Sequence, residues 1–408
     1  MTTLFALVAA PTQGVNLPLQ MLLVFGTAKL LAELCERLKM PGIVGGLLAG
    51  VLLGPSMLNW IQYNDLLHAL AELGVMFLLF QVGLEVKASE LLKVGKTALT
   101  VAVVGVILPF LFGWAILLGA HHKQMEAIFM GATMVATSVG ITAQVLSAKG
   151  LLSHQTAKII LAAAVIDDVL GLLVLAVVSS MGEGRGIDFL GILTTTLVSV
   201  GFVMAVVRYG TKTVNIVLPK ILTNFKVQEA EFAAAVSFLF VMALLASYSG
   251  VAAIVGAFLA GMALAESASP RLNTLVHGSG ELMIPFFLAS IGLQMDLSVF
   301  KSGQTLALGL AILFAAVLSK AVGCALGAWK LGFKDAARIG LGMVPRGEVG
   351  MVIAQVGLSK GSISQEAYAI AVFMSVATTI LAPPLLYLAY RDLSSTAAGG
   401  NDTLGDFE

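Results

Sequence analysis

The stretch AAAVIDDVLGLLVLAVV, residues 162–178, decides how the chain is interpreted, because Asp167 and Asp168 interrupt an otherwise apolar run. If this run crosses a membrane, each charge near the bilayer centre costs about 2.5–3.5 kcal/mol on the insertion scale. Packing gives no reason to keep two such charges. They are either buried bridges to basic partners or, as intramembrane acids usually are, part of an ion or proton site.

The composition supports a membrane location. The 408 residues are 58% hydrophobic and 11% charged, with a mean hydropathy of +0.98, whereas soluble domains average about 25% charged residues. Formal net charge is zero, and without a basic patch we expect no nucleic-acid partner. Cys35 and Cys324 give neither a disulfide framework nor metal-ligand spacing. The partner that the composition implies is the lipid bilayer.

Apolar runs of roughly 20 residues are long enough to cross about 30 Å of hydrocarbon as helices. The sequence predicts an all-α polytopic protein with about 13 transmembrane helices, forming a single membrane domain over residues 1–408 that is embedded from about 17 to 390. No basic region precedes the first apolar run, and the tail from 394 is short and polar, so we expect neither a leader nor an appended soluble domain. The predicted spans are 17–38, 42–59, 66–84, 97–119, 124–147, 154–181, 189–213, 228–249, 251–266, 275–294, 304–330, 335–358 and 367–390.

An odd number of spans places the two termini on opposite sides, and the basic residues decide which side is which. With the N-terminus outside, 16 of the 23 Lys and Arg residues fall on the inner side and 4 on the outer side, the other 3 lying within spans. Because cytoplasmic loops carry the excess of Lys and Arg, we expect a multi-pass protein of the cell (inner) membrane with a cytoplasmic C-terminus.

Two pairs of segments resemble each other at an offset of about 210 residues. GGLLAGVLLGPS at 45–56 matches VGAFLAGMALAES at 255–267, and MFLLFQVGLEVK at 76–87 matches FFLASIGLQMDL at 286–297. Seven spans separate the copies, so the copies run in opposite directions. Inverted repeats of this kind are typical of secondary transporters. We expect the repeats at about 42–181 and 251–390.

The same offset aligns two polar interruptions. MVATSVGITA at 134–143 falls opposite MVPRGEVGMVIA at 343–354, and both bring polar residues and glycine into apolar spans. Paired interruptions predict two discontinuous helices whose free ends gather near the membrane midplane. Irregular backbone is tolerated at that depth only where protein buries it or where it lines a cavity.

Helix geometry gives the two aspartates different surroundings, because neighbouring residues differ by about 100° around the axis. One carboxylate can face a water-filled cavity while the other faces a neighbouring helix. Lys320, in AILFAAVLSKAVG at 311–323, is the only lysine deep within a span and is the natural partner for one of them. We expect Lys29, two turns from its cytoplasmic end, to extend to the interface.

The segments AAVIDDVLGLLVLAVV, ATSVGITAQVL, LSKAVG and GMVPRGEVGMVIAQVGL resemble the two-aspartate, NapA-like sodium/proton antiporters of the cation/proton antiporter superfamily. The resemblance runs from about residue 20 to 390. It implies a homodimer whose protomers each have a dimerisation domain and a core domain with two crossed, broken helices. It implies no cofactor beyond the transported Na+ or Li+ and protons.

The resemblance also implies roles for individual residues. Asp168 matches the carboxylate that binds the proton and the transported Na+, and Asp167 matches the aspartate that bridges to Lys320. Thr137 and Ser138 match the polar break of the first discontinuous helix, and we count them with the aspartates as the cation- and proton-binding set.

The second break matches at Arg346 and Glu348, which we interpret as structural because their opposite charges can balance one another beside free helix ends. Lys320 becomes a candidate second proton carrier. On the span 66–84 and at its end, Glu72, Gln81 and Glu85 are further polar residues to which we assign no role.

The function expected is Na+ (or Li+)/H+ exchange by alternating access, electrogenic if Lys320 carries a proton. The alternative is electroneutral K+/H+ exchange. The potassium-efflux branch has a glutamine–aspartate pair where this chain has Asp167–Asp168, and this difference favours sodium. An enzyme is not expected, because an intramembrane aspartyl protease needs two facing carboxylates that share a proton.

Overall fold

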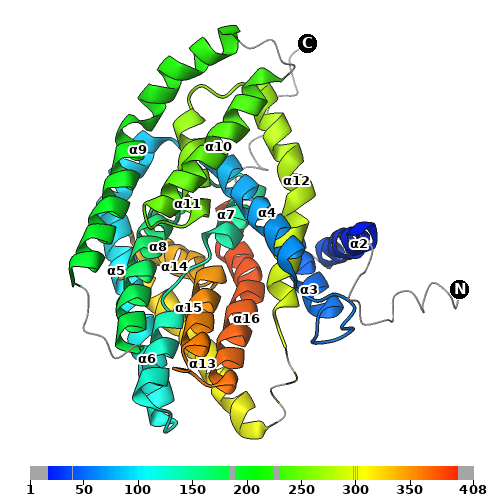
Figure 1. Cartoon of the computed structure of the whole chain (residues 1–408), viewed down its shortest axis with the longest axis vertical. Coiled ribbons are helices and arrows are strands. Elements are labelled where there is room, and N and C mark those ends of the chain that lie inside the picture. Colours follow the sequence, from blue (N-terminus) through cyan, green and yellow to red (C-terminus); the bar gives the residue numbers. More distant parts are fainter. Residues whose placement is uncertain are drawn as a thin grey trace, which may run out of the picture.

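The computed structural model describes residues 17–38, 40–182, 189–224, 229–296, 298, 300 and 302–393, and over these residues it is helical (Figure 1). The predictions about residues 1–16 and the tail from 394 lie outside them. The helices are α2 (Leu17–Arg37), α3 (Gly42–Leu53), α4 (Asp65–Leu84), α5 (Ala88–Gly119), α6 (Gln124–Thr133), α7 (Val139–Ala148), α8 (Gln155–Gly182), α9 (Phe189–Asn224), α10 (Ala230–Tyr248), α11 (Ala253–Leu264), α12 (Pro270–Leu293), α13 (Gly303–Gly327), the 3-10 turn η2 (Trp329–Leu331), α14 (Phe333–Gly342), α15 (Glu348–Ser359) and α16 (Gln365–Ala389).

Each predicted span contains a helix, and the spans 124–147 and 335–358 each contain two. In the described part of the chain, eight helices are long and apolar enough to cross a membrane, and the figure of thirteen spans stays a prediction. The predicted ends were wrong at α9, which continues to Asn224, and at α5, which begins at Ala88. Both extensions contain lysine, and a search for uninterrupted apolar runs ends where a helical turn carries a charge. The search therefore left these extensions out.

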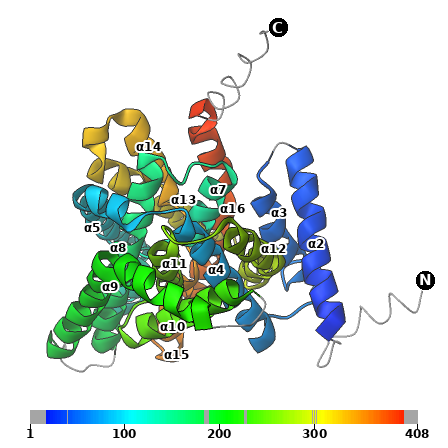
Figure 2. The ribbon, with the colours of Figure 1, turned by 90° about the horizontal axis from the view of Figure 1, so that it is seen from above.

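The helices form two groups (Figures 1 and 2). One, called here the scaffold, contains α2, α3, α4, α10, α11 and α12, with α4 packed against both α11 and α12. The other, called the core, contains α5 to α8 and α13 to α16, built around the contact of α5 with α13. Helix α9 packs against α11 of the scaffold and against α5 and α8 of the core. Few residues of α2 and α9 are buried, 11% of the most apolar window in each, as expected for faces in contact with lipid or with a second subunit.

The scaffold is built around a two-fold relation between α4 and α12. A Cβ on Gly74 of α4 would lie 2.6 Å from the carbonyl oxygen of Met283 of α12. Met283 follows Gly74 by 209 residues, the offset between the two repeats, so the two residues occupy equivalent positions. The helices α4 and α12 therefore cross where equivalent residues of the two repeats meet. The N-terminal part of α4 lines the same cavity as the C-terminal end of α12. The two helices therefore run in opposite directions, as an inverted repeat requires.

Close glycine contacts repeat this symmetry on both sides of the crossing. A Cβ on Gly50 of α3 would collide with Ala289 O of α12, and one on Gly292 of α12 would collide with Leu47 O of α3. The equivalent pair is Gly83 of α4 and Gly261 of α11, whose Cβ atoms would collide with the opposite backbone in the same way. Small residues let helix backbones approach closely in a membrane, where packing is the main attraction between helices.

The correspondence reaches one helix further than the predicted repeats. A Cβ on Gly45 would collide with Leu31 O of α2, and one on Gly256 would collide with Met242 O of α10. Gly256 follows Gly45 by 211 residues, and Met242 follows Leu31 by the same number. We therefore propose that the repeats begin at α2 and α10, with α9 connecting them.

The glycine contacts predict a specific pattern of stability. Gly83→Ala places a methyl group against the backbone of α11, and overpacking of this kind costs about 1–3 kcal/mol. Gly201→Ala, in α9 with open space around it, should be neutral or stabilising, because alanine is favoured over glycine in a helix. The melting temperatures of the two purified variants in detergent measure this difference, and equal values would contradict the close crossing.

Candidate functional site

The two broken helices meet at their interruptions. Between α6 and α7, Ser138 N–H donates to Pro345 C=O at 2.7 Å, across to the break between α14 and α15. Nearby, Thr142 Oγ1 donates to Gly342 O at 2.6 Å. Helix α6 packs against α15, so each half-helix lies beside the opposite half of the other pair, and the two broken helices cross. The approach is close enough that a Cβ on Gly347 would lie 2.7 Å from Ser138 Cβ.

Local chemistry explains the second break better than the first. Pro345 has no N–H to donate, and it disfavours the helical conformation at the residue before it. At the first break the last turn of α6 ends at Thr133, whose hydroxyl bonds back to Phe129 O at 2.9 Å. The segment 134–138 then leaves backbone carbonyls without intrahelical partners, and the side chains described next bind them.

Lys320 is completely buried and binds both a carboxylate and a free helix end. Its Nζ lies 3.0 Å from Asp167 Oδ1, with neither side chain exposed, and donates to Val135 O at 2.7 Å. The other carboxylate oxygen of Asp167, Oδ2, is buried without a hydrogen-bond partner. The pair therefore connects α13, α8 and the C-terminal end of α6.

Arg346 provides the second cation at the same helix end. It is fully buried, and its Nη1 donates to Val135 O and Ala136 O, both at 3.0 Å. Its own backbone is held by α16, where Thr379 Oγ1 donates to Arg346 O at 2.6 Å. Cations are stabilising at the C-terminal end of a helix, where the carbonyls carry partial negative charge.

Asp168 faces a different environment. It is 5% exposed and lines a cavity of about 470 Å³, called here the aspartate cavity. The residues that begin α7 and α15 lie around the same cavity, and helix N-termini favour negative charge. The cavity also contains polar side chains from both helix groups, namely Tyr63, Asn64, Asp65, His68, Glu72, Thr137, Ser138, Ser290, Gln294, Gln355 and Tyr368.

The donor set around Asp168 suits a hard monovalent ion. A hard monovalent ion is bound by carboxylate, hydroxyl and amide oxygens, which this cavity offers. The described residues contain no group of three or more His, Cys, Asp or Glu side chains that could hold a metal ion tightly. One carboxylate with neutral oxygens can bind an ion that must also be released. The same carboxylate can bind a proton instead.

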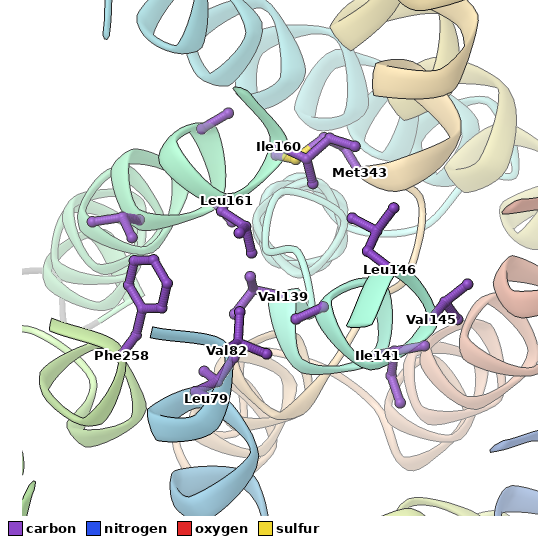
Figure 3. Packing of buried hydrophobic residues seen from close by; sticks show 14 of the residues in the cluster. Leu79, Val82, Val139, Ile141, Val145, Leu146, Ile160, Leu161, Phe258 and Met343 are labelled. Atoms are coloured by element: carbon purple, nitrogen blue, oxygen red, sulfur yellow. The ribbon is translucent and has the colours of Figure 1, made fainter. Parts of the chain in front are cut away.

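Apolar side chains of the core and the scaffold pack together around Leu161 of α8 (Figure 3). Leu161 precedes Asp168 by seven residues, which is about 10 Å along α8. Around it Val139 of α7, Val82 of α4 and Phe258 of α11 belong to one buried cluster. These side chains bring core and scaffold into direct contact. In this conformation Asp168 therefore opens toward the end of the molecule where α4 begins.

Beyond this layer lie two adjoining cavities of about 470 and 540 Å³, together called the opposite cavity. The first is lined mainly by α2, α3, α7 and α12, and the second by the C-terminal ends of α4 and α7 and the N-terminal part of α12. The aspartate cavity and the opposite cavity therefore lie at the two ends of the same contact between core and scaffold.

The comparisons with known proteins agree with this arrangement. The sequence profile described as "Sodium/hydrogen exchanger, transmembrane" matches residues 21–387. The chain belongs to this family of sodium/hydrogen exchangers. Its fold is similar to "the sodium proton antiporter MjNhaP1 from Methanocaldococcus jannaschii at pH 8", with a TM-score of 0.63 and 20% identity over 95% of this chain and 98% of that one.

Curated relatives of the exchanger family match over nearly their whole length. The "Na(+)/H(+)-K(+) antiporter GerN" of Bacillus cereus is 34% identical over 374 residues, 90% of this chain and 94% of that protein. The "High-affinity Na(+)/H(+) antiporter NhaS3" of Synechocystis is 31% identical over 425 residues, 94% and 91% of the two chains. The assignment to the cation/proton antiporter superfamily is confirmed.

Within this exchanger fold the predicted residues occupy two places. Asp168, Thr137 and Ser138 share the aspartate cavity, whereas Asp167 and Lys320 form a buried pair away from it. Arg346 lies at the end of α6, and Glu348 begins α15 with a side chain outside the described set.

Sequence reasoning missed two features of the site. Thr378 Oγ1 accepts from Arg346 N–H at 3.2 Å and, with Thr379, holds the second break; two adjacent threonines in an apolar span were the available signal. The ion pair of Lys29 with Glu281 of α12 at 2.7 Å was also missed. That acid lies 252 residues away, and no local pattern connects the two.

The buried pair predicts non-additive stability changes. Asp167→Asn or Lys320→Met alone leaves one buried charge without its partner, which costs about 3–5 kcal/mol. The double variant removes both charges, so its melting temperature should fall by less than the sum of the two single changes. Additive losses would contradict a direct charge pair.

Proposed function

We propose that this chain exchanges Na+ or Li+ for protons at Asp168 by alternating access. The observation that supports the proposal most directly is the position of Asp168, which lies at the inner end of a polar cavity and behind an apolar layer that separates it from a second cavity. Movement of the core against the scaffold would close the first path and open the second, which is how repeat-built transporters alternate.

Competition for one carboxylate couples the two fluxes. A proton and a hard cation both bind a carboxylate, so each must leave before the other is bound. Thr137 and Ser138 would supply or orient neutral oxygens beside Asp168, and water would complete the shell. No covalent step and no cofactor is needed.

Lys320 is proposed as the second proton carrier. When a cation at Asp168 rearranges the neighbouring Asp167, the ion pair weakens and burial favours loss of the lysine proton. Two protons, from Asp168 and Lys320, would then exchange for one Na+, and exchange would be electrogenic. Arg346, whose contacts are to backbone carbonyls, is proposed to be structural.

Two other functions are less well supported. The name of the Bacillus cereus relative includes K+ as well as Na+, which keeps K+/H+ exchange as the alternative. Intramembrane proteolysis lacks its catalytic pair, because Asp167 contacts Lys320 whereas Asp168 faces the aspartate cavity.

The assembly and orientation remain proposals. We infer a homodimer in the cell (inner) membrane, supported by the apolar faces that α2, α9 and α10 leave exposed. The distribution of basic residues supports an external N-terminus, so the aspartate cavity would open to the outside.

Exchange measured in proteoliposomes tests the proposed function. Adding Na+ or Li+ outside vesicles that contain the wild-type protein should drive protons in the opposite direction, with a smaller response to K+. Asp168→Asn should abolish the flux, because an amide neither releases a proton nor neutralises a cation. A flux close to wild type in this variant would overturn the assignment, and a response to K+ alone would favour the alternative.

Voltage tests the role of Lys320. Lys320→Gln should retain part of the exchange, but the membrane potential should no longer drive Na+ uptake. The double variant Asp167→Asn/Lys320→Gln, which also removes the carboxylate that Lys320→Gln leaves without its ammonium partner, is the control for loss of folding. An active variant that still responds to voltage like the wild type would leave Lys320 a structural role only.

A further inference from the structure

The repeats carry an equivalent pair of titratable residues that the proposed mechanism does not use. His68 and Glu72 lie one helical turn apart on α4, and His277 and Glu281 have the same spacing on α12. Each is separated from its counterpart by 209 residues, the offset that also relates Gly74 to Met283 at the crossing of α4 and α12. The two pairs are therefore the same positions of the two repeats.

The inverted relation places these pairs in different cavities. His68 and Glu72 line the aspartate cavity, with side chains 56% and 53% exposed and 3.4 Å between His68 Nε2 and Glu72 Oε1. His277 and Glu281 line the opposite cavity. Both helices belong to the scaffold, so each cavity has one of these two equivalent glutamates on its wall. The opposite cavity also contains Glu36, Glu85 and Lys149.

The two glutamates differ in their charge partners. Glu281 forms an ion pair with Lys29 of α2 at 2.7 Å. The residue equivalent to Lys29 in the second repeat is Phe240 of α10, at the offset of 211 that relates α2 to α10, so symmetry places no lysine beside Glu72. The charged and titratable side chains that share the aspartate cavity with Glu72 are Asp65, His68 and Asp168, together with the phenols of Tyr63 and Tyr368. The fixed groups in this cavity are therefore predominantly acidic.

We infer that Glu72 and Glu281 are equivalent cation-recruiting residues for the two access cavities, and that Lys29 weakens recruitment at one of them. The inference rests on the proposed exchange function. A carboxylate on the wall of a cavity raises the local concentration of cations there. The ion pair with Lys29 cancels this effect at Glu281. Glu72 should therefore contribute to the apparent Na+ affinity at the aspartate cavity, whereas Glu281 should contribute at the opposite cavity only when Lys29 is removed.

Side-specific kinetics test this inference. Right-side-out and everted membrane vesicles that contain the full-length protein expose opposite faces, and the initial rate against external Na+ gives a KM for each face. Glu72→Gln should raise KM about threefold at one face only, with the maximal rate unchanged, as expected for loss of electrostatic recruitment. Lys29→Gln should lower KM by a similar factor at the other face only. Added choline chloride should reduce both differences by screening.

Matched variants separate recruitment from structure. Glu72→Asp, which keeps the charge, should retain the wild-type KM. Asp296→Asn, just after the end of α12, and Glu33→Gln, on α2, remove exposed carboxylates that do not line either cavity. These two should change KM at neither face.

The possible failures can be told apart. An unchanged KM for Glu72→Gln at both faces, an equal change at both faces, or a fall in maximal rate alone would overturn the inference while leaving the exchange function intact. Absence of exchange in the wild-type vesicles would overturn the proposed function, and the inference with it.

Discussion

Free backbone groups at the crossing of two interrupted helices are the constraint on which the rest of this structure depends. Inside a bilayer no water is available to satisfy them, so protein groups must bind them. Lys320 and Arg346 bind the carbonyls that end α6, and the buried cations in turn require Asp167. With one aspartate and two cations arranged around one helix end, Asp168 is left to face the helix N-termini and the cavity.

The inverted repeat relates the two broken helices to each other without making them identical. Two equivalent units place one cavity on each side of Asp168, with apolar contacts between core and scaffold closing one of them. The units are not identical in charge, because Thr137 occupies in the first break the position that Arg346 has in the second, 209 residues on. A threonine hydroxyl can contribute to an ion's shell, whereas an arginine repels a cation. Thr137 lines the aspartate cavity together with Asp168, whereas the guanidinium of Arg346 binds backbone carbonyls that follow α6.

Much of this architecture could be predicted from the sequence, since the signals are local or periodic. Pro345 and Gly347 indicated the second break, and the two aspartates indicated an intramembrane polar site. The choice between Asp167 and Asp168 came from family resemblance, because helix periodicity states only that they diverge. The pair Lys29–Glu281 was not predictable, since it depends on how α2 and α12 pack. The extent of α9 was missed because its last turns carry lysines outside the apolar run. A cavity beside one aspartate was predicted, but its lining was not, because the lining residues come from several helices of both groups.

The central claim is that a cation and a proton compete for Asp168. The most direct test is proton release from the purified protein in weakly buffered detergent solution when NaCl is added, followed with a pH-sensitive dye against choline chloride at equal ionic strength. The account predicts that Na+ binding releases protons from the wild type, and that Asp168→Asn releases none from this site. Tight Na+ binding without proton release, or wild-type release from Asp168→Asn, would contradict it.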